Sequence, residues 1–126
     1  MKSARSALIT GGAGFIGSHM ADELISDGWK VTVLDNLITG KRENLEHLSG
    51  DPSLRFVEGD VSDKDLLKRL LKGIDAVFHF AAMVSVPLSI EKPEECHLNN
   101  VTAFSDLIIA LKDVNIPLIY ASSAAV

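Results

Sequence analysis

A short apolar run that leads directly into closely spaced glycines is the feature that most constrains the fold of this chain. Residues 4–10 predict a buried strand, and the TGGAGFIG that closes it places Gly11, Gly14 and Gly17 in a G-x-x-G-x-x-G pattern. Apolar residues at helical spacing then predict a helix over residues 15–27. A glycine turn between strand and helix lets the backbone approach a pyrophosphate, which free N–H groups of the helix N-terminus can bind. The same pattern also occurs in glycine turns that hold no ligand.

The rest of the chain alternates predicted strands with predicted helices. Segments rich in β-branched or alternating apolar residues predict further strands at residues 30–35, 54–58, 74–80 and 117–121. Between them we expect helices at residues 62–72 and 93–112, and a polar loop over residues 36–51 that could contain one helical turn at residues 43–48. Ser62 is the expected N-cap of the helix at residues 62–72. Strands separated by helices imply a parallel sheet, and right-handed crossovers give the strand order 3-2-1-4-5. We therefore expect an α/β protein with a Rossmann-type, doubly wound sheet.

Two acidic residues follow predicted strands at places where a dinucleotide would meet them. Asp35 closes the second strand, about twenty residues after the glycines, where a carboxylate accepts hydrogen bonds from an adenosine ribose. Because that carboxylate repels a 2′-phosphate, NAD is favoured over NADP, although the nearby Lys41 and Arg42 would favour the phosphate. Asp60 follows the third strand, where it could either cap the next helix or meet the adenine amino group.

The charge balance and the single cysteine exclude several classes of protein. A formal net charge of −5 argues against a nucleic-acid partner, which usually requires a basic face. Cys96 has no partner for an internal disulfide, and with His97 alone it makes no metal site. The apolar stretch near the N-terminus is too short for a signal peptide, and no run reaches the length of a membrane span. We therefore expect a cytoplasmic protein without metal, membrane or nucleic-acid partners.

Six segments resemble, in order and spacing, the motifs of the extended short-chain dehydrogenases, and most of all those of the UDP-sugar 4-epimerases. They are TGGAGFIGSH, VLDNLITGKREN, FVEGDVSD, FHFAAMVSVPLSIEKPEE, NNV and YASSAAV. The resemblance covers essentially all 126 residues. It implies an NAD-binding Rossmann domain, with a UDP-sugar as the substrate of the intact enzyme.

The resemblance also implies a role for each residue at a matching position. The pyrophosphate would be held by Gly11, Gly14, Phe15, Ile16 and Gly17. The ribose would meet Asp35 and Asn36, with Thr39 and Gly40 beside them, and the adenine would meet Asp60 and Val61. Further contacts along the cofactor would come from Phe80, Ala81, Ala82, Asn99 and Ser122. Ser123 matches the family's catalytic serine, whose hydroxyl would hydrogen-bond the reacting oxygen of the sugar.

The segment after the fourth strand bears on the type of enzyme. Ser85, Val86 and Pro87 resemble the epimerases, whereas 4,6-dehydratases typically carry a His-Val-Asp type of sequence at this place. A fragment of a nucleotide-sugar 4,6-dehydratase or reductase on the same fold is the first alternative. The second is a non-catalytic dinucleotide-binding module or redox sensor.

The family's Tyr-x-x-x-Lys proton-transfer pair would follow the fifth strand, and the sequence ends at Val126 before that position. Tyr120 is followed four residues later by Ala124, so we interpret it as core or near-core packing rather than as the base. We therefore expect residues 1–126 to be an incomplete NAD-binding domain, truncated after the fifth strand, that lacks the C-terminal substrate domain and does not turn over substrate alone.

Two features predict association between copies of the chain. The fifth strand would leave Leu118 and Ile119 on an open sheet edge, which invites strand pairing with another copy. In full-length relatives, dimers usually form through two helices of this domain, including the one after the fourth strand. Its apolar face could serve that use or only pack on the sheet, and it comprises Val101, Phe104, Leu107, Ile108 and Leu111.

Overall fold

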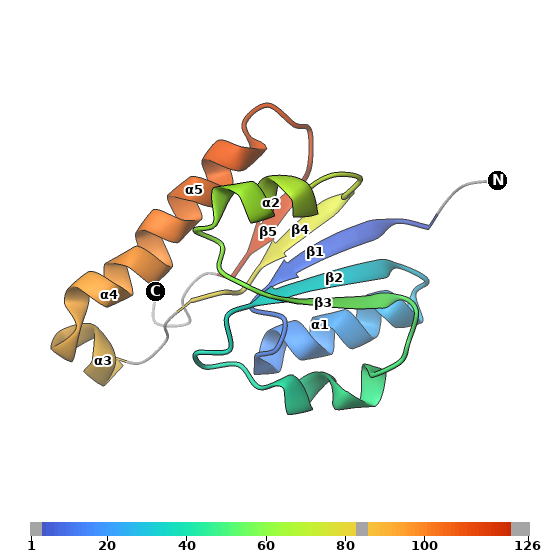
Figure 1. Cartoon of the computed structure of the whole chain (residues 1–126), viewed down its shortest axis with the longest axis horizontal. Helices are drawn as coiled ribbons and strands as arrows, with labels where there is room; N and C mark the ends of the chain where they lie inside the picture. The colour runs from blue at the N-terminus through green and yellow to red at the C-terminus, as the bar shows by residue number, and fades with distance from the viewer. Residues whose placement is uncertain (1–3, 83–85, 122–126) are drawn as a thin grey trace.

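Parallel strands in the order β3-β2-β1-β4-β5 form the sheet, which confirms the predicted topology (Figure 1). The computed structural model describes residues 4–82 and 86–121. The strands are β1 (Ser6–Thr10), β2 (Lys30–Asp35), β3 (Leu54–Glu58), β4 (Ala76–His79) and β5 (Leu118–Tyr120). β2 and β3 have the predicted bounds, whereas β1, β4 and β5 are shorter at their ends.

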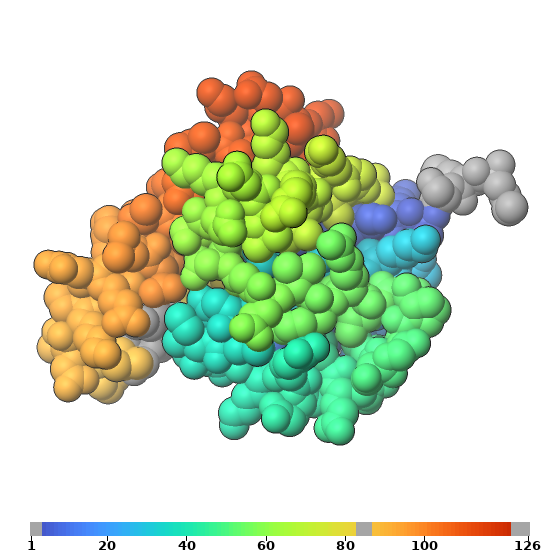
Figure 2. All heavy atoms as spheres, in the orientation of Figure 1, coloured from blue at the N-terminus to red at the C-terminus, as the bar shows by residue number. Residues whose placement is uncertain are grey.

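Helices cover both faces of the sheet (Figure 1). One face carries α1 (Phe15–Ser26) and the 3₁₀ helix η1 (Arg42–Leu48), and the other carries α2 (Lys64–Leu70) and α5 (Ala103–Leu111). The connection from β4 to α5 consists of α3 (Val86–Glu91), α4 (Pro93–His97) and the π-helical turn η2 (Leu98–Thr102). Figure 2 shows this orange segment standing out from the body of the molecule.

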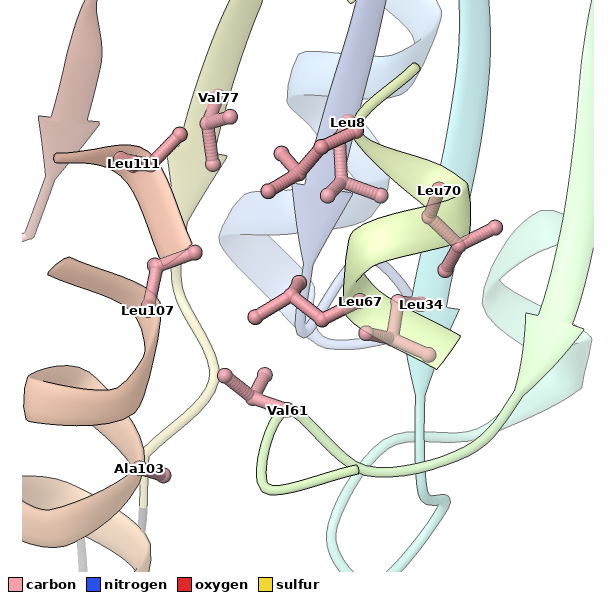
Figure 3. Packing of buried hydrophobic residues seen from close by; sticks show 10 residues of the cluster. Leu8, Leu34, Val61, Leu67, Leu70, Val77, Ala103, Leu107 and Leu111 are labelled. Carbon is pink, nitrogen blue, oxygen red and sulfur yellow. The ribbon is translucent and has the colours of Figure 1, made fainter. Parts of the chain in front are cut away.

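Two apolar clusters, one on each face of the sheet, hold the layers together. In the first, Leu67 of α2 and Leu107 of α5 pack against Leu8 and Val77 of the central strands, and all four side chains are fully buried (Figure 3). Burying one leucine contributes roughly 1.5–3 kcal/mol, so this cluster anchors both helices to β1 and β4. The second cluster joins the sheet to α1 and η1, and its members include Ile9, Val33, Ala21 and Leu45.

The cap of α2 differs from the prediction. Asp63, not Ser62, is the N-cap residue, and its carboxylate accepts a hydrogen bond from the Leu66 N–H at 3.1 Å. The charges along the helix follow the expected dipole pattern, with Asp65 in the first turn and basic residues in the last. The cap therefore lies one residue later than predicted, because aspartate caps a helix as well as serine does and Asp63 has the extended backbone of an N-cap residue.

The long helix predicted over residues 93–112 is interrupted by η2. The side chains of two neighbouring asparagines bond back to the preceding turn: Asn99 Nδ2 donates to the Glu95 carbonyl at 2.9 Å, and Asn100 Nδ2 donates to Cys96 Sγ at 3.4 Å. Such side-chain bonds compete with the regular helical ladder and accompany the wider turn. The short helix α3 was not predicted, because a six-residue segment that contains Pro87 carries little periodic signal.

Apolar side chains are exposed on the α4–α5 segment and on β5. Leu107 and Leu111 pack on the sheet as one alternative predicted, but Val101 is 50% exposed and Ile108 is 44% exposed. The prediction that Tyr120 lies in or near the core was wrong, because its ring contacts Phe104 at 5.1 Å yet remains 56% exposed at the edge strand. Among the described residues, no helix has the length and apolarity needed to cross a bilayer.

Candidate cofactor site

A groove of about 460 Å³ opens where the strands of the parallel sheet end, within the size range of small-molecule sites. Its walls come from the segments that follow all five strands, so residues far apart in the sequence meet at one edge of the sheet. The lining includes every predicted cofactor residue that the structure describes: Gly11, Gly14, Phe15, Ile16, Gly17, Asp35, Asn36, Thr39, Gly40, Asp60, Val61, Phe80, Ala81, Ala82 and Asn99. Ser122 and Ser123 lie outside the described residues. The sequence did not single out further lining residues, namely Leu34, Ile38, Gly59, Ala103 and Ala121.

The three glycines of the G-x-x-G-x-x-G pattern are needed for different structural reasons. Gly11 has a φ of +69°, and a Cβ there would lie 2.6 Å from the Ala81 nitrogen. A Cβ at Gly17 would overlap the Gly11 carbonyl oxygen and would lie 2.6 Å from the Gly12 Cα, so this glycine lets α1 approach the turn. A Cβ at Gly14 would meet only the Gly11 oxygen, at 3.3 Å. Gly11 and Gly17 are therefore required by internal packing, whereas the bare Gly14 leaves space on the groove side.

The N-terminus of α1 faces this groove with free backbone donors. Gly14 is the N-cap, and the first intrahelical bond runs from the Ser18 N–H to the Gly14 carbonyl. The N–H groups of Phe15, Ile16 and Gly17 precede that bond and have no intrahelical acceptor. Phe15 and Ile16 are 77% and 58% exposed, so the apolar residue Ile16 faces the groove and not the core. Free N–H groups with the positive end of a helix dipole form a cradle for a diphosphate.

The carboxylate of Asp35 is fixed by the loop that follows it. Its Oδ2 accepts a hydrogen bond from the Ala13 N–H at 3.0 Å, and its Oδ1 accepts one from the Leu37 N–H at 2.8 Å. Leu37 itself has a φ of +61°, a left-handed conformation that is uncommon for leucine and that places backbone strain in this loop. Each oxygen keeps a second lone pair for a ligand hydroxyl.

Asp60 belongs to a small hydrogen-bond network and does not cap α2. Its carboxylate accepts bonds from Asn36 Nδ2 at 3.0 Å and from the Ser62 N–H at 2.9 Å. Burial alone would raise the pKa of Asp60, but the bonds from Ser62 and Asn36 outweigh it and bring the pKa below its ordinary value. The network therefore holds an ionised carboxylate at the groove and links the loops after β2 and β3.

Of the two basic residues after β2, Arg42 has its side chain engaged on β3. The Arg42 guanidinium lies 4.5 Å from the centroid of the Phe56 ring on β3, a cation–π contact. The backbone N–H of Lys41 donates to the Ala13 carbonyl at 3.0 Å. The groove lining includes the carboxylate of Asp35 but neither Lys41 nor Arg42, which favours a cofactor without a 2′-phosphate.

A buried polar pair beneath the groove was missed by the sequence analysis. Thr10 and His79 end β1 and β4, and Thr10 Oγ1 lies 2.6 Å from His79 Nδ1. Burial lowers the pKa of His79 to about 4, so the ring is neutral at pH 7. The alternation of β4 could have indicated the burial, because His79 lies two residues after the fully buried Val77.

The groups that line the groove fit a dinucleotide. Backbone donors lie at the helix N-terminus in the middle, and Asp35 and Asp60 lie on one side. Small or apolar residues lie on the other side, at the ends of β4 and β5. No group of His, Cys, Asp and Glu among residues 4–82 and 86–121 could hold a metal ion.

Comparison with known proteins agrees with this geometry. The sequence profile of the NAD dependent epimerase/dehydratase family matches residues 7–126. The chain is 45% identical over 121 residues to a UDP-glucose 4-epimerase of Lactobacillus helveticus, and the match covers 94% of this chain and 35% of that protein.

Solved structures of two epimerases superpose closely on the chain. UDP-N-acetylglucosamine 4-epimerase from Methanobrevibacter ruminantium M1, in complex with UDP-N-acetylmuramic acid, gives a TM-score of 0.89 at 44% identity and covers 99% of this chain. UDP-glucose 4-epimerase from Brucella ovis in complex with NAD gives a TM-score of 0.85 at 37% identity, and the match covers 97% of this chain. The matches span only 40% and 37% of those two chains.

Proposed function

Because the chain belongs to the NAD dependent epimerase/dehydratase family, we propose that it is the NAD-binding portion of a nucleotide-sugar 4-epimerase that acts on a UDP-hexose. The observation that carries this proposal is the groove, in which the glycine turn, Asp35 and the end of β4 lie together as a dinucleotide requires. The epimerase names of the Lactobacillus helveticus, Methanobrevibacter ruminantium and Brucella ovis proteins support the substrate class.

The residues of this chain would bind and orient the cofactor. N–H groups at the start of α1 would hold the diphosphate, Asp35 would accept hydrogen bonds from the ribose hydroxyls, and Asp60 would accept one from the adenine amino group. A bound NAD would supply hydride acceptance and return at C4 of the sugar. Ser123 would hydrogen-bond the reacting oxygen, and the UDP-sugar would be the partner of the intact enzyme.

We further propose that residues 1–126 form an incomplete NAD-binding domain that does not turn over substrate by itself. The reaction needs a base for the C4 hydroxyl proton. Tyr120 is the single tyrosine of the sequence, and the residue four positions later is Ala124 rather than lysine. A serine alone can polarise an oxygen but does not accept a proton near neutral pH. Epimerisation of UDP-glucose by the purified chain above the uncatalysed rate would overturn this proposal.

We also propose that copies of the chain associate through the edge of the sheet. Among the described strands, β5 pairs only with β4. Ile119 is 44% exposed and Tyr120 is 56% exposed on this strand. An apolar edge with unpaired backbone groups is a template for pairing with a second strand.

Calorimetric titration of the purified chain with NAD and NADP tests the cofactor assignment. We expect saturable NAD binding, with NADP at least about tenfold weaker because the Asp35 carboxylate repels the 2′-phosphate. Asp35→Ala should lose most of the NAD affinity, whereas Asp51→Ala, an aspartate on a loop away from the groove, should not.

Absence of NAD binding by soluble, folded chain would contradict the proposal. Full NAD binding without epimerisation in the intact enzyme would favour the dinucleotide-binding module or sensor. Conversion of UDP-glucose to a 4-keto-6-deoxy product would favour the dehydratase.

A further inference from the structure

His79 is a buried titratable residue that has no role among the proposed cofactor contacts. It connects three elements beside the groove, namely β1, β4 and α5. It is the last residue of β4 and only 7% exposed. Its Nδ1 atom lies 2.6 Å from Thr10 Oγ1 at the end of β1. Its ring stacks on Phe104 of α5, with centroids 5.4 Å apart and planes at 29°. One side chain thus connects β4 to the strand that enters the glycine turn and to the helix that flanks the groove.

The hydrogen-bond partners of Thr10 determine which ring nitrogen carries the proton. The Ala81 N–H donates to Thr10 Oγ1 at 3.3 Å, so this oxygen already accepts one bond. Thr10 is fully buried, and among the described residues its own O–H finds an acceptor only at His79 Nδ1. A hydroxyl that accepted from both neighbours would leave its hydrogen without a partner, which is costly in the interior. The threonine therefore donates to Nδ1, and the neutral ring carries its proton on Nε2.

The same pair controls the segment that leaves β4. The Phe80 N–H donates to the Thr10 carbonyl at 2.9 Å, and the Ala81 N–H donates to the Thr10 hydroxyl. Gly11 touches this segment so closely that a Cβ there would lie 2.7 Å from the Phe80 carbonyl carbon. The glycine turn is held separately from β2, because the Gly11 N–H donates to the Leu34 carbonyl at 2.8 Å. Loss of the Thr10–His79 bond should therefore displace the β4 end and leave the diphosphate-binding turn in place.

The β4 end lines the part of the groove that remains for the nicotinamide half of the cofactor. Asp35 and Asp60 mark the adenosine side, and the N-terminus of α1 lies between the two sides. Phe80, Ala81 and Asn99 line the opposite side, together with residues that follow β5 and begin α5, namely Ala121 and Ala103. Ala103 lies next to Phe104, the residue on which His79 stacks.

We propose that His79 is a positioning residue that, as its Nε2–H tautomer, aligns the β4 end and α5 so that the groove accepts the nicotinamide half of NAD. This inference rests on the proposed function. It assigns His79 an effect on one half of the cofactor, which distinguishes it from a residue that only stabilises the fold.

The first test is the tautomer of His79 in the unchanged chain. A long-range ¹H–¹⁵N spectrum at pH 7 reports which imidazole nitrogen is protonated. We expect the proton on Nε2 for His79. A proton on Nδ1 would overturn the proposal, and this measurement requires no variant to fold.

The second test compares the affinities for NAD and for ADP, which carries the adenosine and both phosphates but no nicotinamide riboside. His79→Phe keeps an aromatic ring against Phe104 and removes the bond to Thr10. We expect the Kd of NAD to rise about tenfold, as it does when a tenth of the molecules hold the competent arrangement. The Kd of ADP should change less than about twofold. His47→Phe on η1 is the matched control and should change neither Kd, because His47 contacts Asp22 away from the groove.

Rescue separates positioning from packing. In His79→Asn the amide oxygen can replace Nδ1 as the acceptor for the Thr10 hydroxyl, so NAD affinity should recover to within about threefold of the unchanged chain. Equal losses of NAD and ADP affinity in His79→Phe, or no loss of either, would overturn this inference while the proposed function stands. Absence of NAD binding by the unchanged chain would overturn both.

Discussion

The carboxylate of Asp35 and the bare Cα of Gly40 lie against each other across the loop that follows β2. A Cβ on Gly40 would stand 2.7 Å from Asp35 Oδ2 and 3.0 Å from Oδ1. No side chain fits there unless the carboxylate moves, and the Ala13 and Leu37 N–H groups hold that carboxylate in place. The glycine thus preserves the orientation of the acid that we assign to the ribose.

Gly40→Ala should therefore weaken NAD binding through Asp35. We expect the Kd of NAD to rise about tenfold, equivalent to about 1.4 kcal/mol, because the carboxylate must leave its two backbone donors or the loop must shift. Asp35→Ala alone should be at least as damaging, and the double variant should be no worse than Asp35→Ala, since both changes act on one contact. Independent, additive losses in calorimetric titrations would contradict this coupling.

The glycines of the turn should separate stability from binding. Gly17→Ala forces a methyl group into the Gly11 backbone, and overpacking of this kind costs about 1–3 kcal/mol, so its free energy of unfolding should fall by that amount. Gly14→Ala meets only one atom at 3.3 Å and should leave stability within about 1 kcal/mol of the unchanged chain while NAD affinity falls. Urea unfolding and calorimetric titration measure the two effects. A Gly14→Ala variant that binds NAD normally would refute the assignment of this glycine to the groove.

The sequence predicted the elements whose signal is local and missed those that depend on contacts between distant residues. Strand order, the glycine turn and Asp35 follow from apolar runs and turn residues along a few positions each. The Thr10–His79 bond joins residues 69 positions apart, and it exists only because Thr10 of β1 pairs with His79 of β4 in the sheet register. No periodicity in either segment specifies that register. The positive φ of Leu37 was not predicted either, because leucine seldom adopts this conformation and no local sequence signal indicates it.

The N-cap of α2 gives a test of the revised helix boundary. Asp63→Ala removes the acceptor of the Leu66 N–H and should destabilise the chain by about 1 kcal/mol. Ser62→Ala should cost clearly less, because the serine lies outside the helix. Thermal unfolding of the two variants at pH 7 decides between the caps. The reverse order of stabilities would restore Ser62 as the cap.

Association through β5 can be tested by placing a charge on the edge. We expect the unchanged chain to sediment as more than a monomer at roughly tens of micromolar, because the associated fraction rises with protein concentration by mass action. Ile119→Lys should shift the population to monomer, because a lysine on an edge strand discourages strand pairing. Ile108→Lys on the exposed side of α5 is the comparison variant. It should raise the monomer fraction more than Ile119→Lys does only if copies of the chain associate through their helices. A monomer for the unchanged chain at this concentration would contradict the proposal.

The buried imidazole makes a prediction about pH. His79 titrates near 6.5 when unfolded and at about 4 in the folded chain, where burial disfavours the charged ring. Between these values the unfolded chain binds a proton that the folded chain does not, so acidification favours unfolding. The contribution of the neutral ring is intact above about pH 6.5, decreases as the pH falls toward 4, and amounts to roughly 3 kcal/mol when fully lost, at about 1.4 kcal/mol per pKa unit.

His79→Phe isolates this contribution from the carboxylates that also titrate in acid. Its urea-unfolding free energy should depend less on pH between 6.5 and 4 than that of the unchanged chain, whereas His47→Phe should keep the full dependence. Only burial lowers the pKa of His79, without a charged neighbour, so added salt should leave the difference between the two curves in place. Parallel curves for His79→Phe and the unchanged chain would mean that the ring takes up its proton without unfolding. The Thr10 bond would then not depend on a neutral histidine.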